Sequence, residues 1–543
     1  MGSNEANLFC ELGWQHVFFV PFVGAIFYLE DNMDDNIYYG FLSLLPALIA
    51  IILSICTKNI IVSLLIAVYV GALIINNFNP FTGLISMISD FMYVKIAEES
   101  NAQTIFMMSI IGGFVALLTS TGAANSFAKN MTHKLDSRSK GEFLTWIGGI
   151  VIWFTDTGNS LILGPIFEEI LDKLKTSKEK FAYILDVTSI CDAALIPIIG
   201  WGVYSMGLID TELKNLSINS ISSWTVYVGA IPFNFYAIIS LVLAGFLAFS
   251  QFDFGPMLKA QHRAAVKGET MREGGTPMRK PIKEHFNKDV DVSVWIMIIP
   301  LIVMVITIFT NLILNGFPRD VVPGKMIRSS IAAGFLLASL TLILLSMKDK
   351  IMTFNECMSI FLKGVSNSSF MAVLLTLAWS LGGVSTQMGT AEYILRITEG
   401  FLSPEVLPGI FFLIGCIMSF ATGSSWGTMA ILMPLAIPMA YKLDVSLSVV
   451  VAAVSSGGLF GDSSSPISDT TMLASTGAGG DHMDFFTCML PYSLTVGVIS
   501  FVTFIIAGHM ASNLIIFASL VFVLVLAYLL HKFFMKKYGF DKF

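Results

Sequence analysis

Charge is what this sequence has least of. Only 13% of its 543 residues are Asp, Glu, Lys or Arg, whereas a soluble protein carries about 25%. Hydrophobic residues make up 55% of the chain, and the mean hydropathy is +0.77. A soluble fold is therefore excluded. The apolar runs are about 20 residues long, which fits membrane-spanning helices, whereas a β-barrel would show short alternating segments.

Cysteine pairs are also missing, and we expect neither a cleaved signal peptide nor myristoylation. The six cysteines are scattered, with no CxxC pair and no metal spacing, so we interpret them as small core residues. The N-terminus carries Glu5 and Glu11 and lacks a basic region, so we expect no cleaved signal peptide. The Met1-Gly2 start lacks the hydroxyl residue that the myristoylation pattern requires.

A strongly polar stretch lies between two apolar runs at residues 460–475, Phe-Gly-Asp-Ser-Ser-Ser-Pro-Ile-Ser-Asp-Thr-Thr-Met-Leu-Ala-Ser. It holds Asp462 and Asp469 among seven hydroxyls, and Gly461 and Pro466 interrupt any helix there. Polar, helix-breaking sequence at membrane depth is tolerated only where it lines a cavity or packs inside protein. Ionisable residues at that depth are usually functional. The alternative interpretation is a loop at the membrane surface.

The basic loops predict how the chain crosses the membrane. Lys and Arg gather at 127–140 and 252–290, and the positive-inside rule places both loops in the cytoplasm. Two simple spans account for two crossings between them, so segment 142–170 must return to the side from which it starts. The same argument applies to segment 406–440 and leaves the C-terminal lysines in the cytoplasm. We therefore predict broken or re-entrant helices at 142–170 and 406–440.

Residue spacings in the two halves are alike. The distances 122–156 and 389–423 are both 34 residues, and 165–197 and 434–466 are both 32 residues, between glycines, prolines and one aspartate. The charge pattern makes the two halves run in opposite directions across the membrane. Secondary transporters commonly have such inverted repeats, with a midplane site built from discontinuous helices. We expect that architecture here.

The sequence thus predicts an all-α polytopic membrane protein. We expect an inverted-repeat secondary transporter with two broken or re-entrant helical segments and about 11–14 transmembrane segments. We divide it into an N-terminal extension (1–37), a first transmembrane half (38–251), a basic cytoplasmic linker (252–290) and a second transmembrane half (291–543). The linker has eight Lys and Arg against five acids and no hydrophobic periodicity, so we expect it to be solvated. The expected simple spans are 38–56, 59–78, 104–126, 181–208, 225–251, 292–316, 327–347, 367–388, 485–508 and 512–531.

Candidate ligands come from four polar elements that such a repeat would bring together. They are carboxylate, hydroxyl and amide side chains near the expected helix breaks: Asp156, Asn159, Asp186, Asp192, Thr422, Ser424, Ser425, Asp462, Ser464, Ser468, Asp469 and Thr470. Carboxylate, hydroxyl and carbonyl oxygens are ligands for hard cations and do not suit soft metals. A helix break also frees backbone carbonyls to coordinate Na⁺. These residues therefore predict a hard-cation site.

The same oxygens can serve a proton. A buried carboxylate that loses its cation can hold H⁺, because burial disfavours its charged form. We find no Lys or Arg within the four elements, so a bound cation or proton has to balance the aspartates. The simpler interpretations are that Asp186 and Asp192 cap or orient helices, and that Ser and Thr bond the carbonyl four residues back.

Residues 460–475 resemble the NhaC-type Na⁺/H⁺ antiporter family, whose pattern there is close to Gly-Asp-His-Cys-Ser-Pro-Ile-Ser-Asp-Thr-Thr. Ser463 and Ser464 replace the family's His and Cys, and Thr155 stands where many members have an Asp. Residues 187–189 and Asp192 depart from the usual Asp-Ser-Thr-Ala-Ala-Pro run. The likeness begins near residue 38 and is visible at 79–82, 156–159, 180–186, 231–236, 253–257, 480–482 and 490–492.

The resemblance implies cation/proton exchange, and the family also includes organic-acid and amino-acid exchangers. We expect a secondary active antiporter, not an enzyme, that exchanges Na⁺ for H⁺ through a midplane site of aspartates and hydroxyls. The alternative is a Na⁺- or H⁺-coupled exchanger of an organic acid or amino acid, whose carboxylate would need a cationic side chain or a helix N-terminus. A channel or a membrane sensor is a third class, which the paired broken segments disfavour.

We expect no cofactor beyond the transported Na⁺ and H⁺, with Li⁺ as a substitute for Na⁺. The expected partner is the lipid bilayer and not nucleic acid, and a homodimer is one assembly open to the chain. We expect a multi-pass protein of the cell membrane, with the linker 252–290 and the C-terminus in the cytoplasm.

Overall fold

The fold was analysed in a computed structural model, which describes residues 39–540 apart from 58, 124–134, 154–157, 219, 278–291, 317–322, 368, 391, 394–395, 397–402, 467, 511 and 513. All named elements in this part of the chain are helices. The prediction of an all-α fold is confirmed. The extension 1–37 lies outside the described residues, and the division of the chain into four parts stays a prediction.

The multi-pass membrane character is also confirmed. Eight of the described helical segments are long and apolar enough to cross a membrane, and a ninth results if Ile61–Ile75 and Pro80–Ala97, bent by 118°, count as one. Whether broken helices bring the total to 11–14 stays a prediction. The first elements are η1 (Gly40–Leu44), α4 (Leu45–Thr57), α5 (Ile60–Ile75), α6 (Pro80–Ser86), η2 (Met87–Tyr93), α7 (Val94–Ala97) and α8 (Glu99–Ser120).

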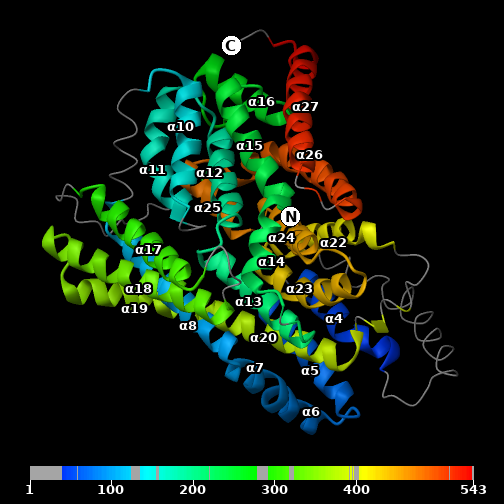
Figure 1. The fold of residues 1–543 in the computed structure, drawn as a ribbon. Helices are drawn as coiled ribbons and strands as arrows, with labels where there is room; N and C mark the ends of the chain where they lie inside the picture. Colours follow the sequence, from blue (N-terminus) through cyan, green and yellow to red (C-terminus); the bar gives the residue numbers. More distant parts are fainter. Residues whose placement is uncertain are drawn as a thin grey trace.

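Three consecutive helices form a group at one end of the molecule (Figure 1), in which the second and third pack against α8 and the first packs against the second. Their exposed apolar side chains, such as Ile306 and Leu344, suit contact with lipid. The sequence did not predict α19, because Glu356 and Lys363 divide its apolar residues and the helix is amphipathic. These helices and the next are α17 (Trp295–Leu314), α18 (Gly324–Lys348), α19 (Phe354–Asn367) and α20 (Ser369–Gln387).

Two helix pairs in each half of the chain are separated by short breaks. Breaks in 142–170, 406–440 and 460–475 are confirmed. The pairs are α10 (Arg138–Val151) with α11 (Gly158–Lys173), α12 (Lys178–Ala193) with α13 (Gly200–Asn215), α22 (Leu407–Thr422) with α23 (Ser425–Lys442), and α24 (Leu447–Ser463) with α25 (Asp469–Ala478).

The first pair, α10 and α11, is a hairpin. At its open end Thr176 Oγ1 donates a hydrogen bond to Glu142 Oε1 at 3.0 Å, so the chain leaves at the end where it entered. At its tip Asn159 Nδ2 donates to the Gly149 carbonyl at 3.2 Å. The re-entrant course predicted for 142–170 is therefore present in the described residues.

The pair α22 and α23 has the same shape. Gly415 lies against Gly457 and Phe420 lies against Gly461, so α22 runs parallel to α24. The four residues 443–446 join α23 to α24, and these two helices pack side by side in opposite directions. Helices α22 and α23 therefore run in opposite directions and form a second hairpin, preceded by η5 (Pro404–Val406).

Helices of each half also pack against the hairpin of the other half. Helix α25 packs on α11 and α12, and α13 packs on α23. Gly164 touches Gly477 across the first contact, and the Tyr204 hydroxyl donates to the Trp426 carbonyl at 2.8 Å across the second. Such reciprocal packing is what an inverted repeat predicts.

Two spans expected to be simple are interrupted. Span 181–208 is divided at residues 194–199, and span 225–251 is divided by a 3₁₀ turn. Pro197 and Pro232 lie in these interruptions, where the missing N–H prevents a regular helical hydrogen bond. The elements of the second span are α14 (Ser223–Ala230), η3 (Ile231–Phe233) and α15 (Phe235–Ser250).

The expectation of a solvated linker is wrong for its first part. Helix α16 packs against α12, α26 and α27, and Met257 and Leu258 are fully buried. We call residues 255–277 the strap. A charge count cannot show that a basic segment carries an apolar face. The helices concerned are α16 (Gly255–His262), η4 (Arg263–Lys267), α26 (His482–His509) and α27 (Ile515–Tyr538).

Ion pairs and hydrogen bonds tie the strap to the start of α26. Arg272 Nε lies 2.9 Å from Asp484 Oδ2, and the Thr276 N–H donates to Asp481 Oδ2 at 2.9 Å. Partial burial works to raise the pKa of Asp481, but the N–H groups that it accepts and the nearby Arg272 hold that pKa below its ordinary value. The strap is therefore an ordered part of the fold.

Candidate functional site

Asp462 lies at the end of α24 and receives hydrogen bonds on both carboxylate oxygens. Oδ2 accepts from the Ser425 N–H at 3.1 Å and from Ser425 Oγ at 2.7 Å. Oδ1 accepts from Ser468 Oγ and from Thr470 Oγ1, the latter at 3.3 Å. The side chain is only 5% exposed. The carboxylate is thus surrounded by hydroxyl groups from two other helices.

The local sequence explains why these donors converge. Gly423 adopts φ +68°, which favours glycine, and ends α22. Ser424 then caps α23 by accepting from the Gly427 N–H at 3.3 Å. Ser468 caps α25 by accepting from the Thr470 N–H, also at 3.3 Å. Asp462 therefore sits at the N-termini of two helices, whose dipoles favour a negative charge.

Asp186 is a second buried acid, and it comes from the first half of the chain. It lies in the middle of α12 and is 0% exposed. Within the described residues, neither of its carboxylate oxygens has a hydrogen-bond partner. It lies close enough to Asp462 for the two carboxylates to interact electrostatically. Two acidic side chains from opposite halves thus share a buried region.

Other predicted ligands lie around this pair. Asp192 is buried at the end of α12, beside the break, and Ser464 is fully buried after α24. Asn159 Nδ2 donates to Thr188 Oγ1 at 3.2 Å, and its Oδ1 has no partner in the described chain.

For three of the predicted ligands, the described part of the structure shows no hydrogen bond to Asp462. Thr422 Oγ1 donates to the Met418 carbonyl at 2.9 Å, which is the simpler interpretation for a helical threonine. Asp469 begins α25, but its side chain is outside the described part. Asp156 lies in 154–157, outside the described residues.

The expectation that the four elements hold no Lys or Arg is wrong for α12, which contains Lys178 and Lys180. Lys180 is 0% exposed, but it pairs with Asp253, which also accepts from the Tyr492 hydroxyl at 2.7 Å. The expected span 181–208 begins after Lys180, and Asp253 falls in the predicted linker 252–290, so the sequence does not predict this pair. Their pairing depends on the tertiary packing of α16 against α12. Within the described chain, no Lys, Arg or His bonds to Asp186 or Asp462.

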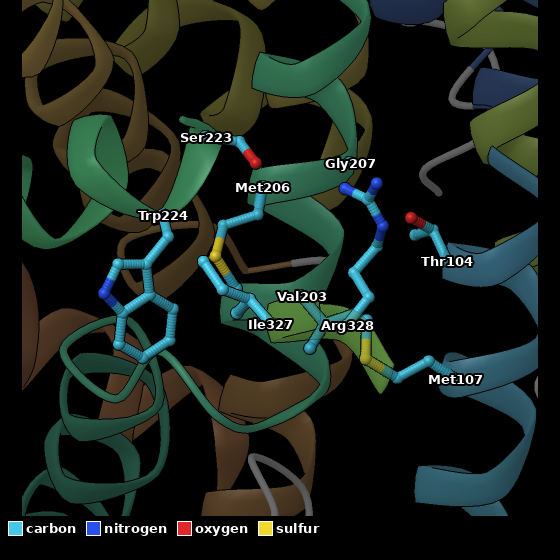
Figure 2. Close-up of a pocket in the computed structure, with 9 residues that line it drawn as sticks. All are labelled: Thr104, Met107, Val203, Met206, Gly207, Ser223, Trp224, Ile327 and Arg328. Atoms are coloured by element: carbon cyan, nitrogen blue, oxygen red, sulfur yellow. The ribbon is translucent and has the colours of Figure 1, made fainter. Parts of the chain in front are cut away.

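The described residues contain no cluster of three His, Cys, Asp or Glu able to hold a metal ion. A cation at Asp462 would therefore need hydroxyl and carbonyl ligands as well. A separate small cavity lies between α8, α13 and α18, and Figure 2 shows Arg328 and Trp224 among its lining side chains. Arg328 Nε donates to Gln103 Oε1 at 2.9 Å. None of the predicted site residues lines this cavity.

Known proteins resemble this chain in sequence or in fold. An uncharacterised protein of Haemophilus influenzae is 29% identical over 88% of this chain and 92% of its own length. The malate-2H⁺/Na⁺-lactate antiporter of Bacillus subtilis is 30% identical over 29% of this chain and 34% of its own. The crystal structure of the YdaH transporter of Alcanivorax borkumensis, described as having an unusual topology, covers 80% of this chain and 90% of its own, with a TM-score of 0.54 and 14% identity.

A family model described as the Na⁺/H⁺ antiporter family matches residues 193–509. The match spans more than half of the chain and includes both helices of the second hairpin and the polar stretch around Asp462. Taken with this all-helical membrane fold, the match shows that the protein belongs to the Na⁺/H⁺ antiporter family, which consists of transporters and not enzymes.

Proposed function

We propose that the protein exchanges Na⁺ for H⁺ at a site formed by Asp462, Ser425, Ser468 and Thr470, with Asp186 as the second carboxylate. The observation that carries this proposal is the convergence of these hydroxyls on a buried carboxylate between two helix breaks. No basic side chain in the described chain neutralises either aspartate. A transported cation is therefore well suited to balance them.

The hydroxyls can serve both states of the cycle. A Ser or Thr hydroxyl donates to a carboxylate through its hydrogen and presents lone pairs to a cation when it rotates. Backbone carbonyls at the breaks are further ligands, as in other transporters with discontinuous helices. When the cation leaves, a proton can replace it on a carboxylate. Asp156, Asn159, Asp192, Thr422, Ser424, Ser464 and Asp469 stay predicted ligands within this proposal.

The test is exchange in proteoliposomes. A Na⁺ gradient, or a Li⁺ gradient, should drive a pH change in wild-type vesicles, and Asp462→Asn should abolish it. Asp444→Asn is the matched control, because Asp444 is exposed and lies outside the site. Exchange retained by Asp462→Asn would remove Asp462 from the site, and no cation-driven pH change in the wild type would overturn the proposal.

A coupled organic-anion exchanger is the second candidate. It is favoured by the Bacillus subtilis relative, which is named for malate and lactate. The helix N-termini of α23 and α25 could face a substrate carboxylate, since they carry partial positive charge. Uptake of radiolabelled malate or lactate against Na⁺, without net Na⁺-driven pH change, would support this candidate over the first.

A further inference from the structure

Glu212 is a buried acid that lies away from the aspartates, in the last turn of α13. It is 1% exposed. Its side chain packs against α20 where two consecutive glycines, Gly382 and Gly383, leave room. A Cβ at Gly382 would clash with Glu212 Oε1. Because Gly382 has no side chain, the Glu212 carboxyl group fits between α13 and α20.

The carboxyl group has little to compensate its charge. Oε2 accepts one hydrogen bond, from Asn215 Nδ2 at 3.3 Å. In the part of the chain that is described, Glu212 makes no other side-chain hydrogen bond and no ion pair. An ionised carboxylate in such surroundings is costly, because neither water nor a cation replaces its hydration.

The charged groups near Glu212 do not neutralise its carboxylate. From α7, Lys95 is the nearest cation, but its Nζ donates to Glu98 Oε1 at 2.8 Å and to Asn215 Oδ1 at 3.2 Å. On α13 itself, Asp210 and Lys214 pair with each other at 3.1 Å. Lys95 is therefore paired with Glu98 and not with Glu212.

Helix α18 brings Arg328 to this end of α13, but Arg328 pairs with Asp210 at 3.4 Å and forms no ion pair with Glu212 in the described residues. From α8, Glu99 pairs with Lys325 at 2.5 Å at the exposed end of the helix. Helices α14 and α20 contain no Asp, Glu, Lys, Arg or His, and α23 has none before Lys442. Within the described residues, each of these cations thus pairs with an acid other than Glu212.

We propose that Glu212 is a proton-binding site, separate from the aspartates and at the end of α12–α13 that lies opposite the strap. The proton is the ligand that fits, since Na⁺ would require several more oxygens than Glu212 and Asn215 supply. Proton binding itself does not depend on the proposed function. Its role in exchange rests on that function: Glu212 passes H⁺ between the aspartates and the side of the membrane beyond α13.

Infrared spectroscopy of the purified full-length protein tests proton binding directly. A protonated carboxyl gives a carbonyl band that disappears on ionisation. Glu212→Gln, which has the shape of the protonated side chain, should lose one such band relative to the wild type. The matched control is Glu99→Gln on the exposed end of α8, which should keep it. Should Glu212→Gln not fold, Asn215→Ala decides instead, because removing the Asn215 donor should shift the same band.

Identical bands in the wild type and a folded Glu212→Gln, or a spectrum that Asn215→Ala leaves unmoved, would overturn the proposal. Transport then tests the role. Na⁺-driven exchange by Glu212→Gln should lose one titrating step from its pH profile, whereas a purely structural role would change the rate without changing the profile. Failure of wild-type exchange would overturn the proposed function and leave the infrared result standing.

Discussion

Ser425 supplies two of the four hydrogen bonds that reach Asp462, one from its main chain and one from its hydroxyl. Ser425→Ala removes only the hydroxyl. A hydrogen bond to a charged group contributes about 1.5–3 kcal/mol, and about 1.4 kcal/mol corresponds to tenfold in affinity. We expect the KM for Na⁺ to rise at least tenfold, measured by Na⁺-driven pH change in proteoliposomes.

The control for this prediction is Ser448→Ala. Ser448 lies on the same helix as Asp462, but its hydroxyl donates to the Val226 carbonyl at 3.0 Å, well away from the aspartate. Its KM for Na⁺ should match that of the wild type. A Ser425→Ala variant with unchanged KM would show that the hydroxyl is no part of the cation site.

For single residues, the sequence predicts which residue types lie at the site better than it predicts their hydrogen-bond partners. The run of hydroxyls beside Asp462 is visible in the sequence, and the structure brings Ser425, Ser468 and Thr470 to that carboxylate. The direction of a hydroxyl is not visible: Thr422 bonds its own helix. Buried charges such as Glu212 are also hidden, because an acid near a helix end resembles a surface residue until its neighbours are known.

Among the helices, α22 and α24 cross closely beside Asp462, and this crossing depends on glycine. A Cβ on Gly461 would lie 2.5 Å from Ser419 Cβ and would also clash with the Phe420 nitrogen. Small residues allow such close approach in membranes. Gly461→Ala should therefore separate the helices and destabilise the fold by about 1–3 kcal/mol. The measurement is the thermal unfolding midpoint in detergent.

Gly200→Ala provides the comparison. Gly200 is also helical, but the nearest atoms to an added Cβ are 3.8 Å away, so the midpoint should stay close to that of the wild type. Equal midpoints for Gly461→Ala and the wild type would mean that the crossing can widen without cost. The two variants thus separate close packing from the general effect of replacing glycine.

Breaks in the helices can be predicted from the sequence where polar residues occur together with Gly or Pro. The breaks at 423–424 and 464–468 follow from Gly423 and Pro466 beside runs of hydroxyls. The sequence does not predict the break at 194–199, although Pro197 lies in it, because the apolar run continues through it. The strap was missed for the opposite reason, since its charges conceal a face that packs on α12 and α26. Local composition does not report which helix a segment meets.

Helix α26 connects the two ends of the whole molecule. Its start adjoins the strap through Asp484 and Arg272, and near its end Gly508 touches Glu405 before the second hairpin. Its 28 residues span about 42 Å at 1.5 Å per residue, enough to cross a bilayer. We therefore expect the strap and the open end of the second hairpin to lie on opposite sides of the membrane.

The positive-inside rule assigns those sides. Arg and Lys are concentrated in 252–290 and at the end of α27, so we propose that the strap end faces the cytoplasm. In a cysteine-free background, Glu273→Cys in the strap should react with a membrane-impermeant maleimide only in inside-out vesicles. Asp444→Cys, which follows the second hairpin, should react only in intact cells, and both positions are exposed. Labelling of both from one side would contradict the crossing by α26, whereas exchange of the two patterns would keep the fold and reverse its orientation.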